Sequence, residues 1–184
     1  MQISGYNPIA ELLLLEDMYF FSYIDLAWGW ATWRIAWEKI DLNYEHWENI
    51  LNLREKPEEL FHDEIIEIFK KVTKPPIRSS SWGYPWNFTK RKNSGFTIVP
   101  SSSLIENIGF GKDATHTKSK PQKFIKRKQL QNKGIYPEFV IRNSEYERVF
   151  WREWRKNRRF PRRLKRKINA FINALNQGNR KKNG

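Results

Sequence analysis

The sequence predicts a mixed α/β domain followed by a basic tail, and three observations support this prediction. Short runs of β-forming residues are bounded by Gly, Pro or Asn, as strands usually are. Longer stretches place apolar residues three, four and seven positions apart, which is the period of a helix. The chain has 184 residues, 39% of them hydrophobic, and this length fits one domain with a substantial core.

Three segments predict strands. Gln2–Ser4 ends at a glycine, and Phe20–Tyr23 is a second short run of aromatic residues. Phe96–Val99 is the third, and Pro100 ends it because proline has no N–H for a strand ladder. The first strand starts at residue 2 with no segment before it, which is unusual for a complete domain, so we expect the chain to be truncated.

A tryptophan-rich segment predicts the first helix. Trp30, Trp33 and Trp37 fall at i, i+3 and i+7, which places them on one helix face. We interpret Trp33 and Trp37 as core residues. Trp28 and Trp30 flank Gly29 at the start of this helix, where their rings either pack in the core or face a ligand.

A second helix is predicted to begin at Pro57–Glu59, because proline and acidic residues favour a first turn. Lys70 and Lys71 suit its C-terminal end, and Pro75-Pro76 stops it. The residues of its apolar stripe are Leu60, Phe61, Ile65, Ile68, Phe69 and Val72.

Two later motifs combine residues that suit a ligand. Trp82, Tyr84 and Trp86 alternate around a glycine and a proline; flat rings stack on sugars or on single-stranded bases, and core packing is the alternative. Asp113 and His116 lie in a glycine-bordered loop. They could share a divalent ion or hold a diphosphate, and a capped turn is the alternative.

The net charge of +14 is concentrated in the tail. Of 34 Lys and Arg and 20 Asp and Glu, residues 151–184 hold 13 and 1, which leaves 21 and 19 in residues 1–150. The two parts therefore carry +12 and +2. The tail could be a solvated extension, could bind an anionic membrane through its interleaved aromatic residues, or could bind nucleic acid.

Several classes of site are excluded by the sequence. The chain has no cysteine, so disulfides and thiolate metal sites cannot form. It has no phosphate-binding loop of the Gly-rich type, no His-Glu-x-x-His zinc motif and no nucleophile elbow.

Taken together, the motifs resemble one family, and they occur in a fixed order along residues 2–118. They are Ile3-Ser4-Gly5-Tyr6-Asn7, Tyr19-Phe20-Phe21-Ser22, Trp28-Gly29-Trp30-Ala31-Thr32-Trp33-Arg34, Trp82-x-Tyr84-x-Trp86-Asn87 and Asn107-Ile108-Gly109-Phe110-Gly111-x-Asp113-Ala114-Thr115-His116-Thr117. This pattern resembles the C-terminal half of bacterial GT-A type nucleotide-sugar glycosyltransferases, of the family-2-like or haemolytic-protein-like sort. It is distantly similar to eukaryotic enzymes that add N-acetylglucosamine to mannose.

The resemblance implies an α/β sandwich that transfers a sugar from a nucleotide-sugar donor to a glycan acceptor, in surface polysaccharide or lipopolysaccharide assembly. It also implies a Mn or Mg ion that neutralises the leaving diphosphate. Asp113 and His116 would then lie on the donor and metal side. The residues that would line the acceptor side are Trp28, Trp30, Trp82, Tyr84 and Trp86.

Two departures from the family pattern lead us to expect an inactive or partial enzyme. The nucleotide-binding half that should precede Ile3 is absent, so it could be supplied by a separate partner chain. Gly83 occupies the position where the family usually has Asp, the expected acceptor base.

We therefore predict an acceptor-side portion over residues 1–150 and a basic, partly helical tail over residues 151–184, located in the cytoplasm or at the inner face of the membrane. The alternative is a protein that binds nucleic acid or another polyanion through the tail. The tail residues expected to contact a membrane or polyanion are Arg155, Arg158, Arg159, Arg162, Arg163, Lys165, Arg166 and Lys167.

Overall fold

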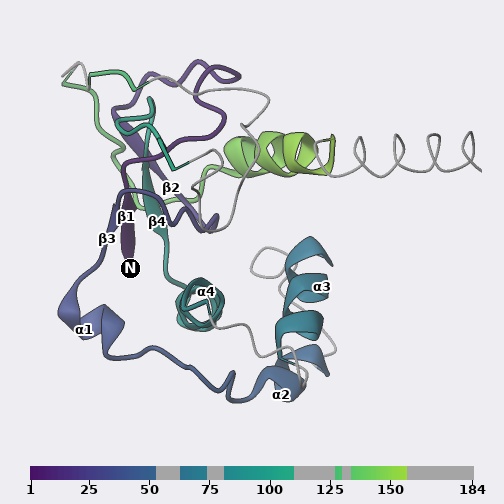
Figure 1. Ribbon diagram of the computed structural model, residues 1–184. Coiled ribbons are helices and arrows are strands. Elements are labelled where there is room, and N and C mark those ends of the chain that lie inside the picture. The colour runs from purple at the N-terminus through teal and green to yellow at the C-terminus, as the bar shows by residue number, and fades with distance from the viewer. Residues whose placement is uncertain (53–62, 74–80, 110–126, 130–133, 157–184) are drawn as a thin grey trace, which may run out of the picture. The chain divides into compact units, whose positions relative to one another are not determined.

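The structure is a computed structural model of the 184-residue chain, and it describes residues 1–52, 63–73, 81–109, 127–129 and 134–156 (Figure 1). The chain divides into two compact units, Met1–Ser144 and Glu145–Gly184. The first unit combines helices with a four-stranded mixed sheet. The predicted α/β class is therefore confirmed at this level.

The sheet has the strand order β2-β4-β1-β3. Strand β1 (Gln2–Ser4) lies parallel to β4 (Thr97–Pro100) and antiparallel to β3 (Trp30–Ala31). Strand β2 (Tyr19–Ser22) pairs antiparallel with β4. The predicted strands at Gln2–Ser4, Phe20–Tyr23 and Phe96–Val99 are thus confirmed, with bounds shifted by one residue in the last two.

The helix predicted from the tryptophan spacing is wrong in its first half. Trp30 belongs to β3 and pairs with Ser4 of β1, and helix α1 covers only Arg34–Trp37. Gly29 precedes the strand with a φ of +54°, in the left-handed region that a right-handed helix does not use. Pairing with β1 thus overrides the local periodicity, and Trp33 and Trp37 are exposed rather than in the core.

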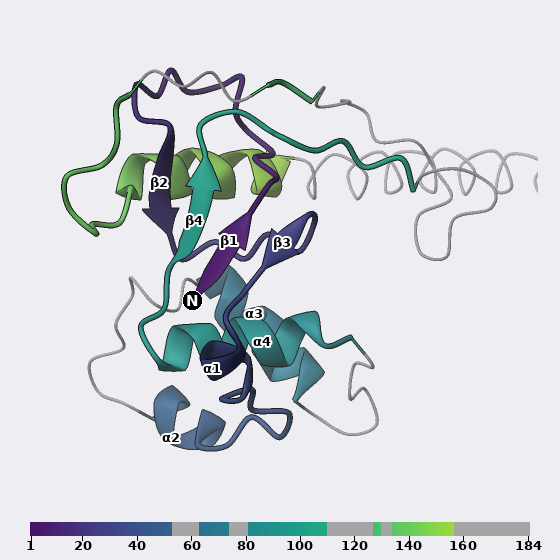
Figure 2. The same ribbon diagram turned by 90° about the vertical axis from the view of Figure 1, so that its left-hand side faces the viewer.

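The other helices of the first unit are α2 (Trp47–Leu51), α3 (Asp63–Val72) and α4 (Gly83–Lys92). Figure 2 shows α1 to α4 together on one side of the strands, below them in that view. Helix α3 confirms the second predicted helix within the described residues, and it buries Ile65, Phe69 and Val72. The predicted positions Leu60 and Phe61 lie outside the described residues.

Helix α4 was not predicted, because Gly83 and Pro85 at its start are typical of a turn. Pro85 is the third residue of the helix. The first four N–H groups of a helix have no partner within it, so a missing N–H there costs little. A sequence that reads as a loop can therefore begin a helix of ten residues.

Four buried aromatic residues form the core between helices α2, α3 and α4, and we call them the closed aromatic cluster. Phe69 and Phe88 lie at its centre with ring centroids 5.6 Å apart. Tyr44 packs against Phe88 at 5.5 Å, and Trp47 against Phe69 at 5.3 Å. All four side chains are buried, so the cluster is a structural core.

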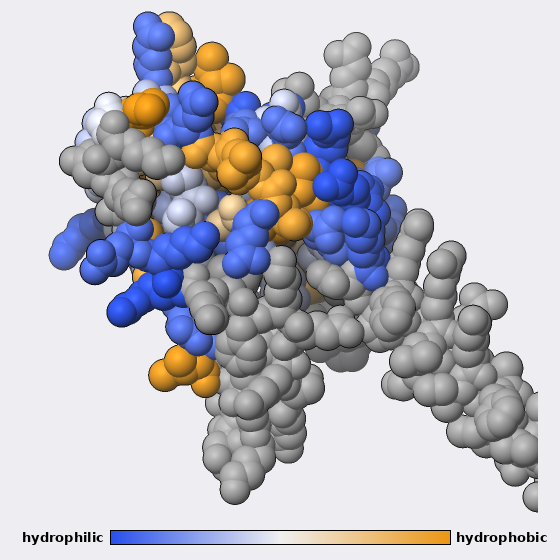
Figure 3. Space-filling model, turned by 90° about the horizontal axis from the view of Figure 1, so that it is seen from above, coloured by the Kyte–Doolittle hydropathy of each residue, from blue (hydrophilic) through white to orange (hydrophobic). Residues whose placement is uncertain are grey.

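Hydrophobic side chains also reach the surface, as the face in Figure 3 shows. Leu14 and Ile108 are the most exposed of the large ones, at 103% and 87%. Residues 135–141 contribute a further group of exposed hydrophobic side chains. No helix within the described ranges is both long and apolar enough to cross a membrane.

The second unit contains a helix over the described residues 144–156, of which Ser144 belongs to the first unit. Tyr146 and Trp151 on this helix are buried, and Arg155 is exposed. The chain passes from one compact unit to the other between residues 144 and 145, six residues before the boundary expected from the charge distribution.

Candidate functional site

The fold brings together several of the aromatic residues that the sequence predicted for the acceptor side. Trp30 from β3 and Trp82 from the start of α4 stack with ring centroids 4.7 Å apart and an interplanar angle of 22°. Trp37 from α1 lies 5.8 Å from Trp30 and 5.4 Å from Trp86. We call Trp30, Trp37, Trp82 and Trp86 the open aromatic cluster.

Exposure distinguishes the members of this cluster. Trp82 and Trp37 are 40% and 37% exposed, so ring surface is available to a ligand. Trp86 is fully buried, and its Nε1–H donates to Oε1 of Gln2 at 3.2 Å. Its ring therefore supports the cluster from within and cannot itself stack on a ligand in this structure. Tyr84, the second residue of α4, is 37% exposed.

Trp28, also predicted to line the acceptor side, packs against Tyr6 with ring centroids 4.7 Å apart. Burial raises the pKa of the Tyr6 hydroxyl. The backbone around it is tight, because the Gly5 N–H donates to the Gly29 carbonyl at 2.7 Å. A Cβ atom on Gly29 would lie 2.9 Å from the Ile105 side chain, and the positive φ of Gly29 would strain any other residue, so glycine is favoured there.

A buried polar network lies behind the open cluster, and sequence reasoning missed it. Lys90, on α4, is fully buried, and its Nζ donates to Oε1 of Gln2 at 3.2 Å and to Oγ1 of Thr97. Its Nζ also donates to Oδ1 of Asp25 at 3.4 Å. The Gln2 amide donates in turn to the Leu26 carbonyl. One signal in the sequence could have indicated that Lys90 lies beside the tryptophans. Trp82, Trp86 and Lys90 are spaced four residues apart, which places them on one face of a helix.

Gly83, at the position of the expected acceptor base, is the first residue of α4. Its N–H donates to Oγ of Ser81 at 3.4 Å. A Cβ atom here would meet only that same oxygen, at 3.5 Å, which is an ordinary contact. The position could therefore accept a carboxylate, but glycine provides no proton acceptor.

A second ionic contact ties the chain after α1 to helix α4. Lys92 Nζ lies 2.6 Å from Oδ2 of Asp41, and the Asp41 N–H donates to Oγ1 of Thr89 at 2.7 Å. Burial acts to raise the pKa of Asp41. The hydrogen bonds from Lys92 and from the backbone of Glu45 and Asn43, with the Lys92 charge, outweigh it, so the pKa is lowered.

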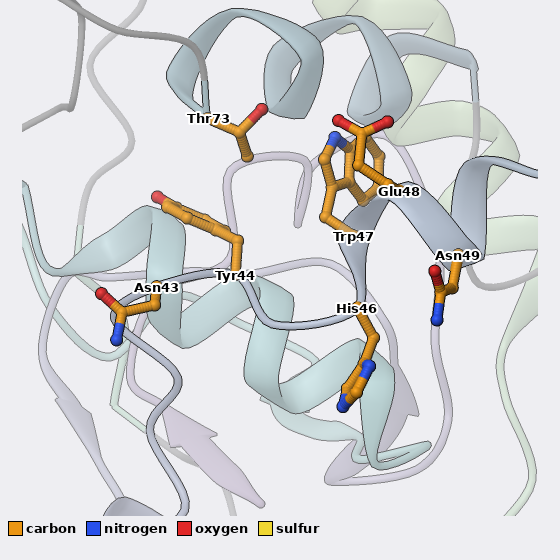
Figure 4. Close-up of a pocket in the computed structure, with 7 residues that line it drawn as sticks. All are labelled: Asn43, Tyr44, His46, Trp47, Glu48, Asn49 and Thr73. Atoms are coloured by element: carbon orange, nitrogen blue, oxygen red, sulfur yellow. The ribbon is translucent and has the colours of Figure 1, made fainter.

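A cavity of about 430 Å³ lies beside α2, away from the predicted residues (Figure 4). Tyr44 and His46, which line it, have φ values of 57° and 66°, in the left-handed region that costs energy for such residues. Figure 4 shows that His46 and Asn49 point away from Thr73 on the opposite wall. The polar groups that line the cavity therefore do not converge on one point. The lining residues are Asn43, Tyr44, His46, Trp47, Glu48, Asn49 and Thr73.

The predicted donor and metal residues, Asp113 and His116, lie outside the described residues. Within the described ranges, no three His, Asp or Glu side chains are grouped so that they could hold a metal ion. Of the predicted tail contacts, only Arg155 is described, and it is exposed. Those outside the described residues are Arg158, Arg159, Arg162, Arg163, Lys165, Arg166 and Lys167.

Comparison of this chain with protein-family models, with curated proteins and with solved structures finds no match.

Proposed function

We propose that this chain is the acceptor-side portion of a GT-A type nucleotide-sugar glycosyltransferase, and that the open aromatic cluster binds a glycan. The function class comes from the motif resemblance. The mixed α/β sheet supports the proposal only at the level of fold class. The observation that carries glycan binding is the stacked pair of Trp30 and Trp82 with partly exposed ring surface beside it.

The geometry of the cluster suits a sugar because its rings are held before any ligand arrives. Trp30 is fixed in a strand and Trp82 at a helix start, and the buried Trp86 is anchored by its hydrogen bond to Gln2. A rigid aromatic surface binds an apolar sugar face with little loss of side-chain entropy. Tyr84 adds a hydroxyl at the exposed start of the same helix.

Under this proposal, the chain alone binds an acceptor but does not transfer a sugar. Gly83 provides no base for the acceptor hydroxyl. Donor binding would depend on Asp113 and His116, with a Mn or Mg ion at the diphosphate, and on a partner chain for the remaining nucleotide contacts.

Calorimetric titration with a panel of neutral oligosaccharides tests the glycan-binding proposal. We expect binding by the wild-type chain and a loss of about tenfold or more in Trp82→Ala, since removing one stacked ring typically costs about 1–3 kcal/mol. Trp33→Ala is the matched control, because Trp33 is 49% exposed and has no part in the cluster. An equal loss in both variants, or no binding to any glycan, contradicts the proposal.

The donor side is tested separately by incubating the chain with nucleotide sugars and Mn²⁺ and measuring the released nucleoside diphosphate. We expect no turnover above background by the chain alone. We also expect Asp113→Asn and His116→Ala to weaken any Mn²⁺-dependent nucleotide binding. Robust turnover by the isolated chain would reject the claim that it is inactive. Tight, tail-dependent binding of labelled DNA with base preference would instead favour a nucleic-acid-binding function.

A further inference from the structure

Residues 135–142 form a loop whose two ends are fixed to the edge of strand β2. The Met18 N–H donates to the Ile135 carbonyl at 2.9 Å, and the Asn143 N–H donates to the Phe21 carbonyl at 2.8 Å. Phe21 also forms a parallel bridge with Arg142. Both anchors lie within the first compact unit.

The loop has more chain than its anchors require. Met18 and Phe21 are three positions apart on the extended strand, which is roughly 10 Å, whereas positions 135 to 142 could span roughly 23 Å. The surplus must leave the sheet edge. In Figure 2, the loop that leads into the unlabelled green helix projects to the left, beyond β2.

Three consecutive hydrophobic side chains lie in this loop. Phe139, Val140 and Ile141 are 62%, 66% and 67% exposed. The Ile141 N–H donates to the Phe139 carbonyl at 3.0 Å, so the backbone turns tightly between them. Single exposed hydrophobic residues are normal, but a contiguous exposed group marks a surface that meets an apolar partner.

The segment that precedes the loop in the sequence is basic, which favours an anionic partner. Residues 118–133 contain seven Lys and Arg and no Asp or Glu. Two of them, Arg127 and Lys128, lie in the described part of the chain, and both are exposed. The seven residues are Lys118, Lys120, Lys123, Lys126, Arg127, Lys128 and Lys133.

We propose that Phe139, Val140 and Ile141 insert into the surface of an anionic lipid bilayer. An exposed apolar loop that follows a basic run in the sequence is complementary to a bilayer, because hydrocarbon receives the apolar side chains and anionic headgroups attract exposed basic residues such as Arg127 and Lys128. A purely apolar protein partner would not account for the basic run. The inference goes beyond glycan binding and does not depend on it.

The absence of cysteine allows a direct test. Val140→Cys in the full chain is labelled with an environment-sensitive fluorophore and mixed with vesicles of phosphatidylcholine, with or without phosphatidylserine. We expect a blue shift and an intensity increase with the phosphatidylserine vesicles. Ile108→Cys is the matched control, because Ile108 is 87% exposed and lies between Asn107 and Gly109. An equal response at both labels, or none at Val140→Cys, overturns the proposal.

Vesicle co-sedimentation separates the loop from the basic tail. The triple change Phe139→Ser, Val140→Ser, Ile141→Ser should lower partitioning by about tenfold or more while every basic residue is kept. Leu14→Ser, at a fully exposed residue, should have no effect, and circular dichroism checks that each variant is folded. Unchanged partitioning of the triple variant would show that charge alone binds the membrane. A label shift that rises with protein concentration without vesicles would indicate self-association. Either result overturns the proposal.

Discussion

Both aromatic clusters include a residue of helix α4, but the clusters differ in their exposure to solvent. Helix α4 contributes Trp86 to the open cluster and Phe88 to the closed one. Trp86 and Phe88 are two positions apart in the helix, which rotates them by roughly 200° around its axis. Their rings therefore leave opposite sides of α4. The closed cluster is entirely buried, whereas the open cluster leaves Trp82 and Trp37 partly in solvent.

This difference in exposure indicates a structural role for the closed cluster and a binding role for the open cluster. Burial of an aromatic side chain stabilises the fold, and the closed cluster has that benefit in full. A ring that stays 40% exposed, as Trp82 does, gives up part of the benefit. The exposed rings are therefore the better candidates for binding, and the clusters should respond differently to substitution.

The largest expected effect is on stability, from Phe88→Ala in the closed cluster. Phe88 is fully buried and contacts Tyr44, Trp47 and Phe69, so its removal should lower the free energy of unfolding by about 3–5 kcal/mol. Trp82→Ala in the open cluster should cost only about 1–2 kcal/mol, because much of the ring is already in water. Urea denaturation followed by circular dichroism measures both. Equal costs would contradict the assignment of separate roles.

The second effect tests the support behind the open cluster, which is polar rather than apolar. Lys90→Met removes the donor to Gln2 and Thr97 and leaves Asp25 without its lysine. We expect a loss of about 3 kcal/mol in the free energy of unfolding. The buried Gln2 and Thr97 would lose a hydrogen-bond donor, and Asp25 would lose its opposite charge.

The matched control for Lys90→Met is Lys70→Met, which breaks an exposed i,i+3 pair with Glu67. It should change stability by less than about 0.5 kcal/mol. A gain in stability in Lys90→Met would show instead that the buried charge is retained for a reason other than stability.

The sequence predicts the strands well because β-forming runs ended by Gly or Pro depend on local chemistry. It fails at Trp30, where helical spacing competes with strand pairing to β1, and pairing wins. It also fails at α4, because Gly83 and Pro85 are typical of turns whether or not a helix follows. At Trp30 the outcome depends on strand β1, which is far away in the chain.

The arrangement of the candidate site could not be predicted. The family resemblance assigned Trp30 and Trp82 to one acceptor side, and the structure stacks the two rings. The sequence could not show that Trp86 is buried or that Trp28 packs on Tyr6. Lys90 was missed because a lysine in a basic helical run normally lies in solvent, and its burial is decided by Gln2 and Thr97 across the sheet.

The third prediction concerns the pH dependence of the ion pair between Asp41 and Lys92. Lys92 also lies 5.4 Å from the ring centroid of Phe88, a member of the closed cluster. The pKa of Asp41 is lower in the folded chain, so the unfolded chain binds the proton more tightly. The stability that Asp41 contributes is therefore present above its unfolded pKa of about 3.9, and it is lost as the pH falls through the folded value.

Urea midpoints at several pH values measure this contribution. Asp41→Asn should cost about 1–2 kcal/mol at pH 7 and progressively less in acid, because protonation already removes the charge in the wild type. Glu67→Gln, in an exposed pair, is the control and should change little. A cost that stays constant down to pH 2 would mean that the Asp41 charge is not the cause.

The smallest expected effect is at Gly83, which follows Trp82 of the open cluster. Gly83→Ala should raise the free energy of unfolding by about 0.5–1 kcal/mol, because alanine restricts the unfolded chain and favours the helix. The added Cβ meets only Oγ of Ser81, at 3.5 Å. Gly83→Asp should keep a similar gain, since a carboxylate is favourable at a helix start, and it also returns a proton acceptor to the proposed acceptor side. A destabilised Gly83→Ala would show that glycine is required there by the backbone, so that its presence would say nothing about a lost base.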